Sequence, residues 1–291
     1  MDFRNGKELL DLCREHNLLI SGVMREREIT CGNMTNEQID ARLKEILTIM
    51  KDAAHTPLET PTRSIGGLIG GEAKKTYEFS QTDNNLCGTF LSKAISYSMA
   101  VLEVNATMGL IVAAPTAGSA GVLPGVLLSL QEYRNLSDES ICSAIVHASA
   151  IGYILMRNAS VSGAEAGCQA EVVAASAMAA SAVVELMGGT PEMSLHAASI
   201  ALSNLLGMVC DPIAGLVEAP CQSRNSIGAA NAITCAQLAL AGVTHPIPFD
   251  EMAEAMYRVG KSIPFELRET AMGGNAGTPT ACTLCGGCGK L

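Results

Sequence analysis

The stretch EVVAASAMAASAVVELM at residues 171–187 carries apolar or small residues on every face that a helix would present. Such a helix belongs at the centre of a helical assembly, because a helix at the surface keeps one polar face. The pair Gly188 and Gly189 follows it and predicts where the helix ends. The run at 195–209 has the same all-round apolar character. The two segments predict an all-α fold with buried Ala/Gly-rich central helices.

Further helix patterns flank these two segments. The predicted helices are 6–17, 39–54, 91–109, 137–156, 190–208, 226–240 and 250–262. Thr35 with Gln38 three residues later is a capping-box signature before the amphipathic segment at 39–54. The segment at 57–71 is dense in Pro, Gly, Ser and Thr, which indicates either a connector or a loop that wraps a site. No alternating strand pattern competes, so we expect a single helical domain.

The 291-residue chain is acidic and poor in aromatic residues. Its 19 basic and 29 acidic side chains give a formal charge of −10, which disfavours binding to the phosphate backbone of nucleic acid. Hydrophobic residues make up 48% of the chain, enough for a large core, whereas aromatic residues make up only 3%. The core must therefore be built from small and aliphatic side chains at close backbone spacing.

Neither an export signal nor a membrane segment is expected. Residues 1–16 mix charged and single apolar residues and lack the apolar segment of a secretory signal. The charge-free run at 104–131 is long enough to cross a bilayer, but Pro115, Pro124 and four glycines interrupt it, which predicts buried core and loop. We expect a cytoplasmic protein whose eleven cysteines are thiols or metal ligands.

The cysteines differ in their neighbourhoods. Those in amphipathic or Ala-rich context are expected to be small core residues: Cys13, Cys31, Cys87, Cys142 and Cys235. Cys168, Cys210 and Cys221 instead lie at glycine or proline breaks, in EAGCQAE, MVCDPIAG and EAPCQSRN. Three thiolates without a fourth would leave one iron of a 4Fe-4S cluster open to substrate, as a Lewis acid. Their wide, unequal spacing matches no local zinc or ferredoxin pattern, so spacing alone supports a metal weakly.

A second cysteine signal lies at the C-terminus. Cys282, Cys285 and Cys288 form a C-x2-C-x2-C run like the first part of a ferredoxin loop. No fourth cysteine follows before Leu291. The run is equally consistent with a cluster loop, part of a zinc site, or an unstructured redox-sensitive tail.

Four blocks resemble a known family: NATMGLIVAAPTAGSAGVLPG, NASVSGAEAGCQAEV, GMVCDPIAGLVEAPCQSRNSIGAANA and FELRETAMGGNAGTPTA. They look like the alpha subunit of the bacterial iron–sulfur L-serine dehydratase, and the resemblance covers essentially the whole chain. It implies a helical chain that holds a 4Fe-4S cluster in inter-helix loops through Cys168, Cys210 and Cys221. It further implies conversion of L-serine to pyruvate and ammonia without pyridoxal phosphate. We expect residues 1–60 to form outer amphipathic helices, 61–281 the cluster-binding catalytic domain, and 282–291 a Cys/Gly-rich tail.

The resemblance also implies a partner. In the two-chain form of this family the alpha subunit pairs with a separate beta subunit, so we expect a heteromer. Some single-chain relatives end in a cysteine that can reach the open iron, and Cys282 falls near that position. In this chain nine residues follow Cys282, and two of them are the cysteines Cys285 and Cys288. Which of these three cysteines, if any, is a fourth ligand or an inhibiting tail is left open.

Serine must also be held by its carboxylate and ammonium. Glycine-rich turns with free backbone N–H groups suit an anion. The candidates are Ser64, Gly66, Gly67, Thr116, Gly118 and Ser119 for the carboxylate, with side-chain hydrogen bonds from Asn105, Asn158, Ser160 and Ser162. Each of these polar residues is equally consistent with a cap or turn role. Arg224 pairs either with the substrate carboxylate or in a structural ion pair.

The sequence does not identify the base that removes the Cα proton. The histidines, His16, His55, His147, His196 and His245, fit structural roles, and the resemblance implies that catalytic histidines come from the beta subunit. The carboxylates next to the proposed ligands, Glu165, Glu171 and Asp211, could attract the substrate ammonium. For Glu171 we expect first that it caps the helix that begins near residue 169.

Other functions remain open at this point. A desulfidase or another small amino-acid lyase could use the same cluster, because an iron that binds a hydroxyl also binds a thiol. A redox sensor or electron carrier could use the C-terminal cysteines. A third possibility is a helical scaffold whose thiols are incidental, which would need neither a cluster nor the C-terminal cysteines.

Overall fold

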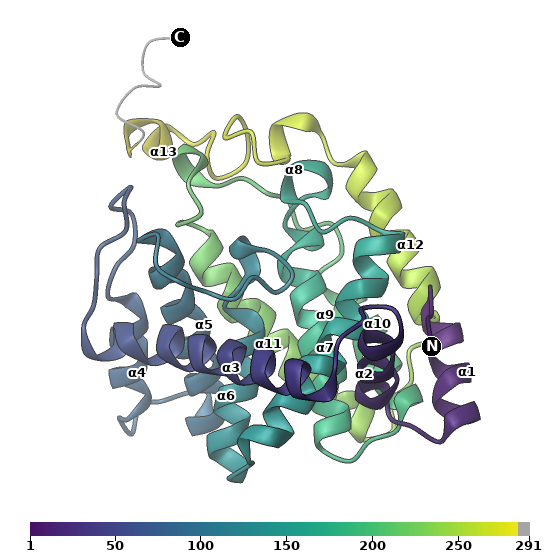
Figure 1. The fold of residues 1–291 in the computed structure, drawn as a ribbon. Helices are drawn as coiled ribbons and strands as arrows, with labels where there is room; N and C mark the ends of the chain where they lie inside the picture. The colour runs from purple at the N-terminus through teal and green to yellow at the C-terminus, as the bar shows by residue number, and fades with distance from the viewer. Residues whose placement is uncertain (285–291) are drawn as a thin grey trace.

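The apolar segment at residues 171–187 forms α9 (Val172–Leu186), and nearly all the side chains of α9 are buried. The computed structural model describes residues 1–284, and within them α9 lies in the middle of a helical bundle (Figure 1). Its packing partners are α6 (Val122–Arg134), α7 (Asp138–Asn158), α10 (Pro191–Asn204) and α11 (Cys221–Leu240). The all-α prediction is confirmed for this part of the chain.

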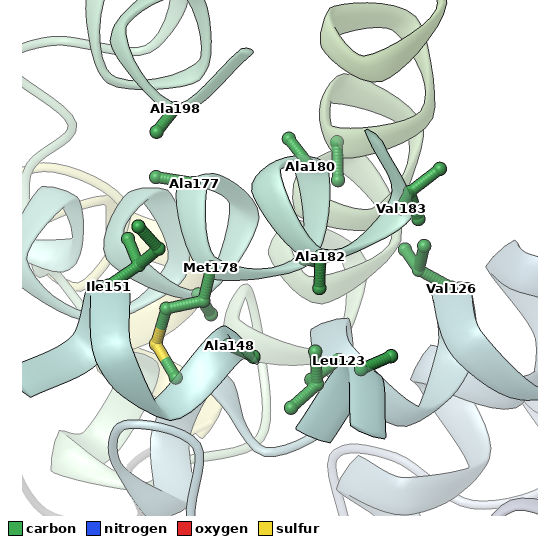
Figure 2. Packing of buried hydrophobic residues seen from close by; sticks show 14 of the residues in the cluster. Leu123, Val126, Ala148, Ile151, Ala177, Met178, Ala180, Ala182, Val183 and Ala198 are labelled. Carbon is green, nitrogen blue, oxygen red and sulfur yellow. The ribbon is translucent and has the colours of Figure 1, made fainter. Parts of the chain in front are cut away.

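Small side chains let these helices approach closely. Figure 2 shows Ala177 of α9 facing Ala198 of α10, and Met178 beside Ile151 of α7. Gly125 on α6 lies so close to the neighbouring helix that a Cβ there would come within 2.8 Å of the Ala94 carbonyl oxygen. The core is therefore made of interdigitated small and aliphatic residues, as the near absence of aromatic residues predicts.

Other helices surround this centre. They are α1 (Gly6–His16), α2 (Ile20–Thr30), α3 (Asn36–Glu59), α4 (Glu72–Ser80), α5 (Gly88–Ala106) and α12 (Phe249–Ser262). The predicted capping box is present at the start of α3, where the Thr35 side chain accepts from Gln38 N and the Gln38 side chain accepts from Thr35 N. Short elements complete the chain: η1 (Ala117–Ser119), α8 (Gly163–Ala166), η2 (Cys168–Ala170), η3 (Ile213–Gly215), η4 (Phe265–Leu267) and α13 (Pro279–Leu284).

The structure differs from the predicted elements at several places. The helices α2, α4 and α6 were not predicted, and α6 occupies the second half of the charge-free run at 104–131. Pro124 does not prevent α6, because it lies in the first turn, where the backbone N–H groups have no intrahelical partner. The helix α11 begins at Cys221 instead of residue 226, which places a cysteine at its first position.

Within residues 1–284, two segments are long and apolar enough to cross a membrane. They are α7 and the stretch from Cys168 to Leu186, and 61% and 83% of their apolar windows are buried inside the bundle. Packing in the core accounts for their hydropathy.

Glu103 is a carboxyl group enclosed by this fold. It lies on α5 with 1% of its surface exposed, and its Oε1 accepts hydrogen bonds from Ala73 N and from Gln222 Nε2, each at 2.9 Å. No partner within the described residues reaches Oε2. Burial therefore raises the pKa of Glu103 above its ordinary value of 4.5.

The substitution E103Q is expected to stabilise the protein increasingly as pH rises. A carboxyl with a raised pKa contributes its full stability below the ordinary value of 4.5, and that contribution is lost as pH rises through the raised pKa. An amide keeps the shape without the charge, so E103Q should gain on the order of 1 kcal/mol of unfolding free energy by pH 8. Urea unfolding at pH 5 and 8 measures this, with E78Q on the exposed face of α4 as control. Equal pH dependence in E103Q and wild type would contradict it.

Candidate functional site

Cys168, Cys210 and Cys221 come together at one end of the bundle. Their exposed fractions are 2%, 2% and 6%, and the cysteines within residues 1–284 form no disulfide. Cys168 begins η2, Cys210 lies in an extended loop, and Cys221 is the first residue of α11. Three buried thiols from segments far apart in sequence are thus gathered in one place.

The turn before Cys168 depends on Gly167. Its φ of 77° lies in the left-handed region, and a Cβ there would come within 2.6 Å of the Met208 carbonyl oxygen. That same carbonyl accepts a hydrogen bond from Gln169 N. The fully buried Gln169 side chain accepts from Gly207 N at 2.8 Å and donates to the Met256 carbonyl at 2.8 Å. The Cys168 turn is therefore fastened to the turn that leads to Cys210.

The C-terminal segment holds Cys210 through its backbone. Cys210 N donates to the Leu267 carbonyl at 2.9 Å, and Glu269 N donates to the Cys210 carbonyl at 2.7 Å. This exchange makes an isolated parallel bridge between Cys210 and Arg268. In Figure 1 the segment crosses the upper end of the bundle, between α12 and α13.

The three thiols influence one another electrostatically. A hydrogen bond from Cys210 lowers the pKa of the Cys168 thiol, and the Arg224 guanidinium lowers it further. The same hydrogen bond and burial raise the pKa of Cys210. Burial raises the pKa of Cys221, and the nearby charge of Cys168 raises it further. Burial and mutual repulsion therefore oppose ionisation of all three thiols together, and added positive charge favours it.

Glu171 lies beside these sulfurs, and its predicted capping role is wrong. It occupies the N-cap position of α9 but makes no side-chain cap hydrogen bond. Its Oε1 instead accepts from Thr116 Oγ1 at 2.7 Å. One ligand atom from each of Cys168, Glu171 and Cys210 lies within 4.8 Å of the others. The Glu171 carboxylate therefore binds Thr116, which is distant in the sequence, instead of the N–H groups at the start of its own helix.

Glycines line the space around this carboxylate. A Cβ at Gly163 would lie 2.6 Å from Glu171 Oε2 and 3.2 Å from Cys210 Sγ. A Cβ at Gly118 would lie 3.1 Å from Glu171 Oε1. The backbone at Gly163 thus passes next to the Cys210 sulfur and the Glu171 carboxylate, and the backbone at Gly118 passes next to the carboxylate. Of the predicted substrate residues, Thr116 and Gly118 are therefore brought to the site.

The loop that carries Thr116 is anchored by Asn225, which is fully buried on α11. Asn225 Nδ2 donates to the Gly118 carbonyl at 2.8 Å, and its Oδ1 accepts from Gly121 N at 3.0 Å. Ser119 contributes to the turn itself, since its Oγ accepts from Thr116 N at 3.4 Å. The sequence alone did not single out Asn225 as an anchor.

The predicted cradle at Ser64, Gly66 and Gly67 binds a carboxylate of the protein itself. Glu218 is 2% exposed and accepts from Ser64 Oγ at 2.6 Å and from Gly66 N at 2.7 Å. Gly67 has a φ of 75°, and its carbonyl accepts from Arg63. Glu218 lies three residues before Cys221, so the loop flanks the site. Substrate binding by this loop stays a prediction.

The remaining predicted polar residues lie in different contacts. Asn158 Nδ2 donates to the Arg4 carbonyl at 2.6 Å, and Ser160 Oγ donates to Glu165 Oε2 at 2.8 Å. The Asn105 carbonyl accepts from Met108 N where α5 ends. No contact described for Asn105, Asn158 or Ser160 within residues 1–284 involves the three cysteines. Their roles toward substrate also stay predictions.

Arg224 forms an ion pair with Asp211, with Nη2 to Oδ1 at 2.7 Å. Its Nη1 donates to the Val209 carbonyl at 3.0 Å and lies 3.6 Å from Cys168 Sγ. Of the two alternatives for this arginine, the ion pair is therefore present in the structure.

Within residues 1–284, no hydrogen bond described for the other cysteines or the histidines involves Cys168, Cys210, Cys221 or Glu171. Cys13 and Cys235 are buried as predicted, whereas Cys31 and Cys87 are exposed, which corrects their predicted place in the core. Cys282 is partly exposed on α13, and Cys285 and Cys288 lie outside the described residues. Fully buried His147 contacts Glu185 Oε2 and Ser181 Oγ, each at 2.8 Å, consistent with its expected structural role.

Glu269 is a residue at this site that the sequence analysis did not assign. Its φ of 63° is unusual for a residue with a side chain, and its N–H binds the Cys210 carbonyl. Burial raises the pKa of Glu171, and the negative charge of Glu269 raises it further. The exposed Glu269 carboxylate thus lies close enough to Glu171, beside the sulfurs, to raise its pKa. Glu269 lies in FELRETAMGGNAGTPTA, one of the four blocks that resemble the family, and that position could have identified it from the sequence.

Comparisons with known proteins show which family the chain resembles. A family model described as serine dehydratase alpha chain matches residues 15–276. The probable L-serine dehydratase alpha chain of Bacillus subtilis is 48% identical over 97% of this chain and 94% of its own length. The L-serine dehydratase alpha chain of Peptoniphilus asaccharolyticus is 44% identical over 94% of each chain. The L-serine dehydratase TdcG of Escherichia coli is 35% identical over 94% of this chain but only 62% of its own length. The three cysteines, Thr116, Glu171 and Glu269 all lie within the matched range, and the chain belongs to the serine dehydratase alpha-chain family.

Proposed function

We propose that this chain is the alpha subunit of an L-serine dehydratase that converts L-serine to pyruvate and ammonia at a 4Fe-4S cluster. The observation that carries the proposal is the convergence of Cys168, Cys210 and Cys221, buried and unpaired, beside the Glu171 carboxylate. The family membership supports the same activity.

The residues present fit such a cluster. Three cysteine thiols are the donors that iron–sulfur clusters take, and Arg224 adds the positive charge that favours a thiolate. Gly163 leaves room beside the Cys210 sulfur, and Gly118 leaves room beside the Glu171 carboxylate, which a Cβ at either position would fill. When bound, a cluster with one iron free of protein thiolate supplies a Lewis acid for the departing hydroxyl group.

The side chains around the sulfurs suit the other groups of serine. Glu171 and Glu269 are carboxylates next to the cysteines and would attract the substrate ammonium. Thr116 Oγ1 fixes one oxygen of Glu171 at 2.7 Å and so orients the carboxylate toward the sulfurs. The residues of this chain thus bind and orient the substrate in the proposal, and removal of the Cα proton is left to a base from elsewhere.

We further propose that this base comes from a separate beta subunit in a cytoplasmic heteromer. The alpha-chain relatives match almost end to end, whereas TdcG has more than a third of its length outside the match. A separate chain would supply what that additional length supplies in TdcG. The unpaired cysteines of residues 1–284 support a reducing location.

Anaerobic purification of the chain together with its beta partner tests the proposal. About four irons per alpha chain and pyruvate formation from L-serine are expected. Rates on L-serine, L-threonine and L-cysteine should be measured side by side, since faster cleavage of L-cysteine would replace the dehydratase with a desulfidase. A single metal ion per chain would contradict the cluster and favour a mononuclear site at Cys168, Glu171 and Cys210.

The substitution E171Q is expected to weaken substrate use without loss of the cluster. It removes the negative charge but keeps the shape and the Thr116 contact, so KM for L-serine should rise about 10-fold or more. The matched control is E192Q, whose carboxylate lies in the first turn of α10 and pairs with Arg14. Initial rates at varied serine concentration and iron content give the result. An unchanged KM would remove Glu171 from the binding site.

A further inference from the structure

Two of the three cysteines are joined by a polar network that the proposed reaction does not use. Its centre is the ion pair between Arg224, on α11, and Asp211, next to Cys210. The two side chains are only 16% and 3% exposed. A buried ion pair of this kind persists only when its other polar atoms are also bound, so each partner contact has a consequence.

Arg224 faces Cys168 on one side of this pair. Its Nη1 donates to the Val209 carbonyl at 3.0 Å and approaches Cys168 Sγ at 3.6 Å, within hydrogen-bond range for sulfur. Its Nη2 is held by Asp211. Both terminal nitrogens of the guanidinium are thus engaged by the chain at the segment that carries Cys210 and at the sulfur of Cys168.

Asp211 is fastened from the other side by the C-terminal segment. Its Oδ2 accepts from Asn275 N at 2.7 Å and from Asn275 Nδ2 at 2.9 Å. The neighbouring Gly274 has a φ of 60°, and a Cβ there would lie 2.1 Å from Asp211 Oδ2. This turn is therefore shaped to fit against the carboxylate. The network runs from Asn275 through Asp211 and Arg224 to the Cys168 sulfur.

We infer that Arg224 is a positioning residue for the cluster, held by Asp211 and Asn275, and does not bind the substrate carboxylate. The inference rests on the proposed cluster. A guanidinium N–H aimed at a ligand sulfur stabilises the negative charge of the thiolate and of the reduced cluster. Because the same guanidinium binds the Val209 carbonyl, it also fixes the distance between the Cys168 and Cys210 segments.

The test compares R224Q, R224K and N275A with wild type in the anaerobic complex with the beta partner. Bleaching of the visible absorbance by an iron chelator measures cluster retention, and redox titration measures the midpoint potential. R224Q should lose the cluster about 10-fold faster or more, with a lower midpoint potential and a KM for L-serine close to wild type. R224K keeps the charge but loses the planar fork, so it should lie between R224Q and wild type. N275A should change retention in the same direction by less.

The matched control is R258Q, because Arg258 on α12 is exposed and, within residues 1–284, pairs with Glu254 alone, one turn away. Cluster retention in R224Q equal to that in R258Q, or a KM raised about 10-fold with normal retention, would overturn the inference. If R224Q does not fold, N275A decides, since it leaves Arg224 and Asp211 in place, and retention equal to R258Q would contradict the network. A wild-type complex without iron contradicts the proposed function and this inference together, whereas normal wild-type iron with unaffected variants contradicts this inference alone.

Discussion

Replacement of Cys168, Cys210 or Cys221 by alanine is expected to abolish cluster binding and serine dehydration. In the proposed cluster each thiolate is one of three protein ligands, and the backbone around each is fixed by Gly167, the Arg268 bridge or the start of α11. Because a metal Lewis acid contributes several kcal/mol to the transition state, activity should fall on the order of 10³-fold.

The matched control for these variants is C235A. Cys235 is also buried and free, but it contacts Asn204 and Asn231 in the interior of the bundle. C235A should keep full iron content and most of the activity, with only a modest loss of stability. Iron analysis, visible spectra and pyruvate assays compare the four variants. A C168A protein that retains four irons and wild-type turnover would contradict the ligand assignment.

The cluster-loaded chain without its beta partner is expected to turn over at about 1% or less of the rate of the complex, because a positioned base contributes roughly 10²-fold or more. The histidines of residues 1–284 are engaged elsewhere or placed away from the sulfurs. His147 is enclosed by Glu185 and Ser181, and His55 contacts Glu132. No contact described for them involves the cysteines or Glu171.

Titration of the cluster-loaded chain with purified beta chain measures this dependence. Pyruvate formation should rise with beta chain and saturate at a fixed ratio of the two chains. The iron content must stay constant during the titration, so that the gain is assigned to the missing base. Full activity of the alpha chain alone would show that its own residues supply the base.

The central helices were predictable because their signal is local. The all-round apolar pattern of α9 has one physical solution, burial on every side, and the structure places α9 there. The helix α6 was missed because Pro124 and Gly125 lower the local preference for a helix, and packing against α5 and α9 overrides that preference. The start of α11 at Cys221 was missed although Pro220, directly before it, is compatible with a helix start.

The candidate site was predictable only in part, because contacts between distant residues complete it. The breaks at Cys168, Cys210 and Cys221 are visible in the sequence, but their convergence depends on the packing of η2, the C-terminal segment and α11. Glu171 has a local alternative, the helix cap, and a contact with Thr116 across 55 residues outweighs it. Contacts between residues so far apart leave no recognisable pattern in the local sequence.

The glycine loop at Ser64 was predicted as an anion-binding turn, but the identity of its anion was not predictable. Its composition indicates an anion-binding turn, and the structure shows a carboxylate bound there, from Glu218. A turn with free N–H groups binds whichever anion the fold brings to it. Sequence alone does not distinguish an internal carboxylate from that of a substrate.

The most direct test of the account adds L-serine to the anaerobic alpha–beta complex while the iron is observed by Mössbauer spectroscopy and pyruvate is assayed in parallel. We expect about four irons per alpha chain, a change in the spectrum of one iron when L-serine binds, and pyruvate formation. Pyruvate formed at full rate by a protein whose iron spectrum does not respond to serine would contradict it.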